Sequence, residues 1–338
     1  MKMRNKIILL INTGTPDKPE TKEVRRFLFQ FLNDRRVIDL PWLAQKLLVN
    51  LVIVPFRSPA STRLYKRLWT KEGSPLLVNM QRLIKKLTNK LDNSTLVYGA
   101  MRYGNPSLKS TLRIIKYEHA EVITILPLFP QYASSTTGSA HQFIMDEIKT
   151  WNIIPEIRFI GQFYSNPVFL RVFADKIQEY KPDSFDHIVF SYHGLPLRQI
   201  AKLHPGHDSE TCDCNIRMPA IGTYCYKATC YDTTRLLSGY LKLGSEKYST
   251  AFQSRMSANW LSPFTDSTLE DLAKRNIKRV LVVAPSFVSD CLETKIEIEI
   301  EYAKLFKQSG GDELAMVESL NDSDEWVDAI IKMVDERQ

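Results

Sequence analysis

The strongest constraint on the fold is a regular alternation of short apolar runs with longer amphipathic segments along the 338 residues. Each apolar run is rich in Val, Ile and Leu, which is typical of a strand buried on both faces of a parallel sheet. The amphipathic segments between them have a helical period, so each is expected to connect two parallel strands. The predicted strands occupy residues 6–12, 95–101, 121–128, 156–161, 187–192, 247–253, 278–284 and 314–318.

These eight strands fall into two sets of four. Counted between first residues, the second-to-third intervals are 26 and 31 residues, and the third-to-fourth intervals are 35 and 36. A Pro-x-Phe turn follows the third strand of each set, at residues 127–129 and 285–287. We therefore predict an α/β protein with two similar Rossmann-like halves. Each half would hold a four-stranded parallel sheet flanked by helices, with the active-site cleft between the halves.

The same pattern predicts the domain organisation. The N-terminal α/β half would span residues 1–165 and the C-terminal half residues 166–320, with a C-terminal helix at residues 321–338. A polar segment at residues 203–230, containing proline and glycine, is expected to be an insertion in the second half.

Composition and charge exclude several classes of protein. Hydrophobic residues make up 44% and charged residues 25%, which is ordinary globular usage, and GxGxxG, GxxxxGK[ST], HExxH and GxSxG motifs are absent. Residues 1–90 carry 19 Lys and Arg against 6 Asp and Glu, whereas residues 290–338 carry 5 against 14. Such a basic region would suit lipid headgroups, nucleic acid or a carboxylated small molecule, although a solvated surface explains it more simply.

The most apolar stretch, residues 37–56, contains two prolines and two charged residues, which makes a membrane-spanning helix a poor fit. Flanked by Arg35, Arg36 and Arg57, it could form a surface that touches lipid, and a core helix explains the pattern equally well. The apolar run near the N-terminus is too short for a secretory leader. We therefore expect a cytoplasmic protein, with peripheral contact at the inner face of the membrane as an option.

Two further features can carry chemistry. His193 ends an apolar strand and precedes a Gly-Leu-Pro turn, where it could ligate a metal or accept a proton, a structural histidine being the alternative. Glu293, Glu297 and Glu301 follow at helical spacing, with Asp290 just before them. Such a ladder could carry a divalent cation, or it could be a solvated acidic face.

Four of the five cysteines, Cys212, Cys214, Cys225 and Cys230, lie within 19 residues. Without a secretory leader, this clustering favours a metal site over disulfides. Cys291 stands apart and is expected to be a free thiol.

Many short motifs, in order along nearly the whole chain, identify a family. The chain resembles ferrochelatase, the protohaem ferro-lyase that inserts ferrous iron into a porphyrin, in a variant with an internal four-cysteine segment. The motifs are NTGTP (12–16), GSPL (73–76), AMRYG (100–104), LPLFPQY (126–132), TTGS (136–139), FSYHGLP (190–196), YCY (224–226), FQSR (252–255), WL (260–261) and SDCLET (289–294).

The resemblance implies insertion of iron into protoporphyrin IX in the terminal step of haem biosynthesis, with a chelatase-like fold. His193 would remove pyrrole protons, and Glu293 would deliver Fe²⁺ with His193 as a further ligand. Asp290, Glu297 and Glu301 would form the metal path. The residues expected around the ring or its propionates are Thr13, Arg57, Tyr65, Ser74, Arg102, Tyr103, Tyr132 and Trp260.

The resemblance further implies a [2Fe–2S] cluster on Cys212, Cys214, Cys225 and Cys230, although four thiolates also suit zinc, or could remain unmetallated. The expected partners are protoporphyrin IX, ferrous iron and a membrane surface, with no nucleic acid. Three other functions stay open: a chelatase for a more carboxylated porphyrin such as coproporphyrin III, a non-catalytic porphyrin or haem carrier, and an iron–sulfur sensor.

Overall fold

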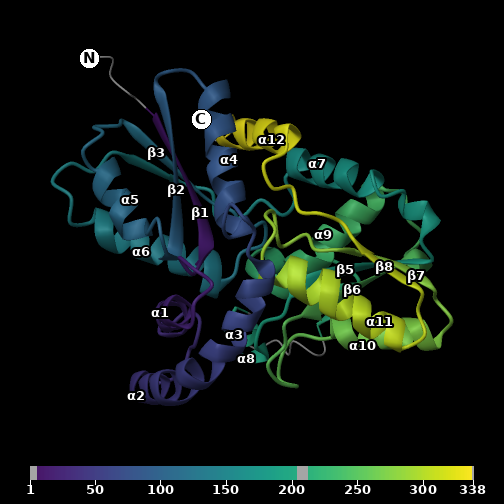
Figure 1. Cartoon of the computed structure of the whole chain (residues 1–338). Helices are drawn as coiled ribbons and strands as arrows, with labels where there is room; N and C mark the ends of the chain where they lie inside the picture. Colours follow the sequence, from purple (N-terminus) through teal and green to yellow (C-terminus); the bar gives the residue numbers. More distant parts are fainter. Residues whose placement is uncertain (1–5, 204–211, 337–338) are drawn as a thin grey trace. The chain divides into compact units, whose positions relative to one another are not determined.

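The computed structural model describes residues 6–203 and 212–336 of the chain. It divides into two compact units, unit 1 at Met1–Gln162 with Asp322–Gln338, and unit 2 at Phe163–Asn321. Helix α12 (Asp324–Asp335), at the C-terminal end, therefore belongs to unit 1, where it packs on α4 (Pro75–Lys90). Figure 1 labels the elements of each unit.

Unit 1 contains a four-stranded, all-parallel sheet in the order β2-β1-β3-β4. Central strand β1 is buried along nearly its whole length, because it pairs with β2 on one side and β3 on the other. The strands span Lys6–Thr15 (β1), Thr95–Gly104 (β2), Val122–Pro127 (β3) and Glu156–Phe159 (β4).

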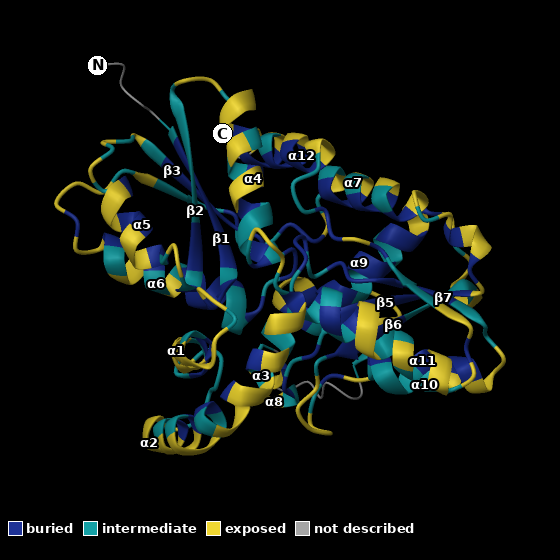
Figure 2. Ribbon diagram, viewed as in Figure 1, coloured by how far each residue is buried: buried dark blue, intermediate teal, exposed yellow. Residues whose placement is uncertain are grey.

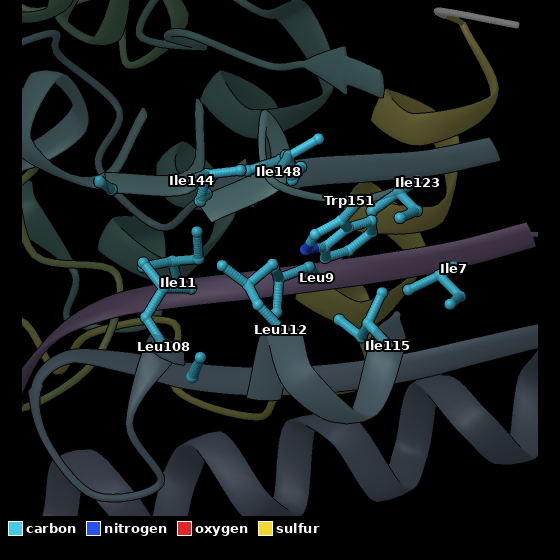
Figure 3. Close-up of a cluster of buried hydrophobic side chains, with 13 residues drawn as sticks. Ile7, Leu9, Ile11, Leu108, Leu112, Ile115, Ile123, Ile144, Ile148 and Trp151 are labelled. Carbon is cyan, nitrogen blue, oxygen red and sulfur yellow. The ribbon is translucent and has the colours of Figure 1, made fainter. Parts of the chain in front are cut away.

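Helices cover both faces of this sheet. Leu108, Leu112 and Ile115 of α5 point toward alternate residues of β1, and α6 completes this core cluster, which Figure 3 shows in close-up. On the other face α4 packs so closely that Gly99 of β2 leaves no room for a side chain beside Ile84. The remaining helices of unit 1 span Thr21–Leu32 (α1), Trp42–Leu47 (α2), Val54–Leu68 (α3), Leu108–Ile115 (α5) and Ser139–Ile148 (α6).

Unit 2 repeats this architecture with a parallel sheet in the order β6-β5-β7-β8. Helix α10, the π-helix Glu293–Tyr302 (the acidic helix) and α11 pack side chains against one face of this sheet. Their core cluster includes Leu269, Ile298 and Phe306. The strands span His187–His193 (β5), Tyr248–Gln253 (β6), Arg279–Val283 (β7) and Glu313–Met316 (β8). The helices span Pro167–Gln178 (α7), Leu197–Ala201 (α8), Tyr226–Tyr240 (α9), Thr265–Lys274 (α10) and Ala303–Gln308 (α11).

All eight predicted strands are confirmed, and so is the α/β class with two four-stranded parallel sheets. The acidic helix differs in detail, because Glu293–Tyr302 is a π-helix that continues into α11. Its i→i+5 hydrogen bonding is rare and is often found at functional sites. Leu48–Ile53 and Ser134–Gly138 are also π-helical.

The apolar segment after α1 forms an outer helical arm of unit 1, made of α2, the π-helix Leu48–Ile53 and the start of α3. Val49 and Val54 face the core, but Trp42, Leu51 and Phe56 are 60%, 65% and 77% exposed. Figure 2 shows the exposed residues along α2. The core-helix alternative for this segment is therefore wrong for most of its large side chains. Among the described residues no helix is both long and apolar enough to cross a bilayer.

Candidate functional site

His193 stands at the end of β5, paired with Gln253 of β6. The Gly194 amide donates to the Gln253 carbonyl at 2.8 Å, and a Cβ on Gly194 would lie only 2.8 Å from that oxygen, so the turn requires glycine. The imidazole lies 6.4 Å from the rings of both Trp260 and Phe287. Its Nδ1 donates to the Gly194 carbonyl at 2.7 Å, because a carbonyl can only accept. In the neutral ring Nε2 therefore carries the lone pair, as a base or metal ligand needs.

Glu293 begins the π-helix of unit 2, and its backbone carbonyl accepts a hydrogen bond from Gln253 Nε2 at 3.2 Å. Gln253 thus contacts both the His193 turn and the start of the acidic helix. The Cys291 side chain hydrogen-bonds to the Glu293 carboxylate. Burial, then the charge of Glu293, raises the pKa of Cys291 well above its ordinary value. Cys291 is therefore a protonated free thiol that donates to the carboxylate.

The Glu297 carboxylate, four residues after Glu293 in the same helix, accepts four hydrogen bonds. Its Oε1 accepts from the Ser254 amide and the Tyr302 hydroxyl, both at 2.8 Å. Its Oε2 accepts from Ser254 Oγ at 2.5 Å and Gln253 Nε2 at 3.1 Å. Ser254 has a φ of +61°, a strained value for serine, and this carboxylate stabilises it. Glu297 therefore anchors the loop after β6 in this structure.

The other acidic residues of the predicted metal path differ in setting. Asp290 is buried and accepts hydrogen bonds from Thr294 Oγ1 at 3.1 Å and Asn321 Nδ2 at 2.9 Å, whereas Glu301 is exposed. Within the described ranges, no three His, Cys, Asp or Glu side chains are gathered as a ready metal site. The carboxylate path therefore stays a prediction.

The four clustered cysteines occupy the segment before α9 and its first turns. Cys214, Cys225 and Cys230 are buried and Cys212 is partly buried. Burial raises the pKa of Cys214 to about 12, opposed by the charge of Lys227 and reinforced by Cys212 and Cys225. Cys230 interacts in turn with Cys225 and Cys214. The four thiols thus interact electrostatically, but no three of them are gathered as a ready metal site among the described residues, and the four-thiolate site stays a prediction.

In unit 1 the predicted porphyrin residues Arg102 and Tyr103 belong to a polar cluster centred on Asp34. One carboxylate oxygen of Asp34 accepts from Arg102 at 2.7 Å, Tyr103 at 2.8 Å and Ser139 Oγ at 2.6 Å. The other accepts from the Arg36 amide at 2.8 Å. Burial raises the pKa of Asp34, but the bonds from Ser139 and the Arg36 amide, with the charge of Arg102, outweigh it and leave this pKa below 3.8.

The other predicted porphyrin residues of unit 1 are more dispersed. Thr13 is partly buried beside Gly14, where a Cβ would collide with the Tyr103 carbonyl. Ser74 is buried and bonded to Thr15 Oγ1 at 2.9 Å. Tyr65 packs edge-on against Phe27. Arg57 is exposed on α3, and Tyr132 lies beside Gly138 at the π-helical turn.

Comparison with known proteins decides the family. The sequence profile of ferrochelatase matches residues 5–338. The chain belongs to the ferrochelatase family. It is 40% identical over 336 residues to the ferrochelatase of Legionella pneumophila (strain Paris), covering 98% of both chains. It is also 40% identical over 342 residues to that of Coxiella burnetii (strain CbuK_Q154), covering 98% of this chain and 94% of the relative.

Solved structures agree on the fold. SirB from Bacillus subtilis with Fe³⁺ has a TM-score of 0.57 at 10% identity, over 98% of this chain and 95% of that one. The sirohydrochlorin chelatase SirB from Bacillus subtilis subspecies spizizenii, in complex with cobalt, has a TM-score of 0.55 at 9% identity, with the same coverage. At these identities the likeness shows the chelatase fold alone. As a ferrochelatase-family member, the chain is a porphyrin metal chelatase, a lyase that inserts iron into porphyrin for haem synthesis.

Sequence reasoning missed three residues that contact the candidate site residues, Asp34, Phe287 and Gln253. Asp34 lies outside every quoted motif, although an acid directly before two arginines could have drawn attention to it. Phe287 was noted only as part of a turn, and its ring lies beside His193. Gln253 belongs to the FQSR motif, but the sequence assigns it no role. Only the structure shows that its side-chain amide connects β5, β6 and the acidic helix.

The Asp34 cluster generates a stability prediction. Asp34→Asn removes the charge that compensates largely buried Arg102, so we expect the free energy of unfolding to fall by about 3 kcal/mol. Because the pKa of Asp34 is lower in the folded than in the unfolded protein, the wild-type carboxylate contributes its stability at pH values above the unfolded pKa, and this contribution is lost as pH falls through the folded pKa. Urea unfolding of both proteins measures the difference.

The matched control is Asp17→Asn, which changes an exposed aspartate bonded to Asn105. It should move the free energy of unfolding by less than about 0.5 kcal/mol. Equal effects of the two substitutions would contradict an anchoring role for Asp34.

Proposed function

We propose that this ferrochelatase-family chain inserts Fe²⁺ into protoporphyrin IX to form protohaem, with His193 as the base and Glu293 as the carboxylate that delivers iron. The observation that carries this is the His193 geometry: Nδ1 is committed to the Gly194 carbonyl, which leaves the lone pair on Nε2, and the rings of Trp260 and Phe287 each lie 6.4 Å from the imidazole. Aromatic faces stack on a flat macrocycle and can hold it over that nitrogen.

Proton balance explains why a base is required. A free-base porphyrin carries two pyrrole N–H protons, and both must leave when one Fe²⁺ enters. Nε2 of His193 accepts one pyrrole proton and passes it to solvent, and the neutral ring then accepts the second, so that both protons leave as the Fe–N bonds form. Glu293 replaces part of the water shell of Fe²⁺ with carboxylate oxygen, which a hard divalent cation accepts. Asp290 and Glu301 would act on the metal path, and Glu297 would join it only by releasing some of the four hydrogen bonds that its carboxylate accepts.

The porphyrin needs partners for its propionates and ring edges. Arg57 is exposed on α3 and supplies a guanidinium that can pair with a propionate carboxylate. Arg102 is bonded to Asp34, so its contribution is to hold Tyr103 and Ser139 in place. The other residues proposed to contact the porphyrin are Thr13, Tyr65, Ser74 and Tyr132 in unit 1 and Trp260 in unit 2. A stiff wall of this kind can bend the ring and point its nitrogen lone pairs at the metal.

The first test separates chemistry from binding. His193→Ala and Glu293→Ala should each lower kcat about 10²–10⁴-fold, because a general base or a metal-delivering ligand is lost, while porphyrin affinity changes little. Anaerobic assays with Fe²⁺ and protoporphyrin IX, followed by the metalloporphyrin spectrum, give kcat, and porphyrin fluorescence gives affinity.

The control is Glu299→Ala, which removes an exposed acid that pairs with Lys295 on the same helix. It should keep wild-type kcat. Near-normal turnover in folded His193→Ala protein would overturn the assignment, and faster turnover of coproporphyrin III than of protoporphyrin IX would transfer the substrate proposal to the more carboxylated ring.

The exposed arm of unit 1 supports a peripheral membrane contact at the cytoplasmic face. Of its large apolar side chains, Trp42, Leu43, Leu47, Leu48, Leu51, Val52 and Phe56 are exposed. Lys46 and Arg57 lie within the same stretch, so the arm joins apolar area to positive charge, the combination that binds anionic lipid surfaces. A hydrophobic porphyrin, poorly soluble in water, would be exchanged most easily at such a surface.

Replacing Trp42 and Leu47 together by Ser should weaken binding to vesicles of anionic phospholipid at least about tenfold, because each large side chain is worth about 1.5–3 kcal/mol when buried. The free energy of unfolding should stay within about 0.5 kcal/mol of wild type, since both residues are exposed. Vesicle co-sedimentation and urea unfolding measure the two quantities.

Ile153→Ser is the control, because Ile153 is equally apolar and 74% exposed but lies outside the arm. It should leave vesicle binding unchanged. Loss of stability with unchanged vesicle binding in the Trp42 and Leu47 variant would favour a packing role for the arm.

The cysteine segment supports a [2Fe–2S] cluster as resident cofactor. The segment supplies the four thiols that such a cluster requires, three of them buried, and Lys227 lowers the pKa of Cys214 and Cys225 against the effect of burial. No three of these thiols are gathered as a ready metal site in the described ranges, so a cluster would have to draw them together. Cys212, Cys214, Cys225 and Cys230 would hold the group. When bound, it would crosslink the segment to α9 and supply a one-electron redox centre.

Anaerobically purified protein should be coloured, with about two irons and two acid-labile sulfides per chain. Replacing any one of the four cysteines by Ser should bleach it and lower the melting temperature, whereas Cys291→Ser should keep the colour. Colourless protein with one zinc per chain would indicate a structural zinc site in place of the cluster. Metal-free protein of full activity would overturn both the cluster and the zinc site.

A further inference from the structure

A carboxylate of the protein itself occupies an anion-binding cluster in unit 1. Asp34 follows α1, and its Oδ2 accepts three hydrogen bonds. The donors are the Arg102 guanidinium at 2.7 Å, the Tyr103 hydroxyl at 2.8 Å and Ser139 Oγ at 2.6 Å. Its Oδ1 accepts from the Arg36 amide at 2.8 Å. A guanidinium, two hydroxyls and a backbone amide thus converge on one carboxylate, as they do where a protein binds a carboxylate ligand.

Contacts other than the Asp34 carboxylate also hold the Arg102 guanidinium. Its Nε donates to Ser139 Oγ at 2.8 Å, at the start of α6. Its Cζ lies 4.8 Å from the centroid of the Tyr103 ring and 4.6 Å from that of Phe143. A hydrogen bond and two cation–π contacts therefore fix the guanidinium. If the Asp34 carboxylate alone were removed, these donors would remain around a space of carboxylate size.

The charged groups of this cluster are its more accessible part. The side chains of Asp34 and Arg102 are 10% and 19% exposed. Tyr103 and Ser139 are more deeply buried. A carboxylate that arrives from solvent would therefore meet the Asp34 charge in the position that it needs, and like charges at hydrogen-bonding distance repel each other. Built-in repulsion of this kind is a common source of specificity.

We propose that Asp34 is a specificity-determining residue, which fills a carboxylate site beside the porphyrin and thereby limits how many substrate carboxylates the enzyme accepts. This rests on the proposed function, which places Arg102 and Tyr103 around the ring. Protoporphyrin IX carries two propionates, and coproporphyrin III carries four. An additional propionate at this place would have to displace the Asp34 carboxylate or remain unpaired beside it. Asp34 therefore favours the ring with fewer carboxylates.

Asp34→Ala tests the carboxylate site without any porphyrin. Formate is small enough to enter the space left by the carboxylate and to accept from the same donors. In about 100 mM sodium formate the variant should melt at least about 2 °C higher than in sodium chloride of equal concentration, because a ligand bound only by the folded state stabilises that state. Two controls should melt alike in both salts. They are wild type, whose site is filled, and Asp17→Ala, which loses an exposed carboxylate bonded to Asn105.

Two porphyrins test the specificity role. In anaerobic assays with Fe²⁺, the ratio of kcat/KM for coproporphyrin III to that for protoporphyrin IX should rise at least about tenfold in Asp34→Ala, because a propionate gains charge-assisted hydrogen bonds. Formate competes for the same donors, so it should return this ratio toward the wild-type value. The ratios of wild type and Asp17→Ala should be equal and independent of formate.

The outcomes separate the site from its role. A formate effect on Asp34→Ala no larger than that on Asp17→Ala overturns the carboxylate site and the specificity role with it. A clear formate effect with an unchanged ratio of the two porphyrins overturns the specificity role alone. Wild type that inserts iron into neither porphyrin overturns the proposed function, and the formate measurement still decides the carboxylate site. A wild-type preference for coproporphyrin III overturns the proposed substrate and the specificity role together.

A second variant covers a folding failure of Asp34→Ala in chloride. Its refolding yield in formate against chloride then decides the carboxylate site, and equal yields overturn it. Asp34→Asn keeps the side-chain volume and loses the charge that repels a further propionate, so its porphyrin ratio should also rise. An unchanged ratio in folded Asp34→Asn protein overturns the specificity role.

Discussion

One buried amide, the side chain of Gln253, connects the parts of unit 2 that carry chemistry. Its Oε1 accepts from Ser191 of β5 at 2.8 Å, and its Nε2 reaches the Glu293 carbonyl and the Glu297 carboxylate. Its backbone carbonyl accepts from Gly194. A buried amide group with unmet bonds would be costly, so these contacts are mutually dependent. The register that pairs His193 with Gln253 therefore fixes the base and the start of the acidic helix together.

Unit 1 uses a different anchor for the same purpose. Asp34 gathers Arg102, Tyr103 and Ser139, three side chains from two elements that lie far apart in sequence. In unit 1 the charged Asp34 carboxylate holds the neighbouring side chains together, as the neutral Gln253 amide does in unit 2. A charge is needed because the largely buried Arg102 requires a counter-ion. The two sheets have the same topology, but their polar anchors are not alike. Both sheets end their strands in the same arrangement, but the polar side chains at those strand ends differ between the two units.

The pattern of apolar runs was sufficient to predict all eight strands, because strands buried on both faces leave a continuous signal. The residues of the candidate site were harder to predict from the sequence. His193, Glu293 and the four cysteines could be selected from motifs, whereas Asp34 and Gln253 act through contacts with residues 40 to 105 positions away. The spacing of the acids predicted a helix but not its type, and Glu293–Tyr302 is a π-helix with i→i+5 hydrogen bonds.

Anchoring by buried polar groups has a consequence for catalysis. Insertion of iron needs a bent porphyrin, and a wall bends a ring only if the wall is stiffer than the ring. The Glu297 carboxylate, with its four donors, and Ser254, held at a φ of +61°, fix the loop beside Gln253, and our proposal needs such a fixed loop beside the ring. A glutamate fully occupied in this way is poorly placed to exchange ligands rapidly with a passing cation. Glu293 has its carboxylate beside one protonated thiol, so it can release that bond and turn to the metal with less loss. The difference in bonding between two acids on one helix thus supports the proposed transfer of iron by Glu293 and an anchoring role for Glu297.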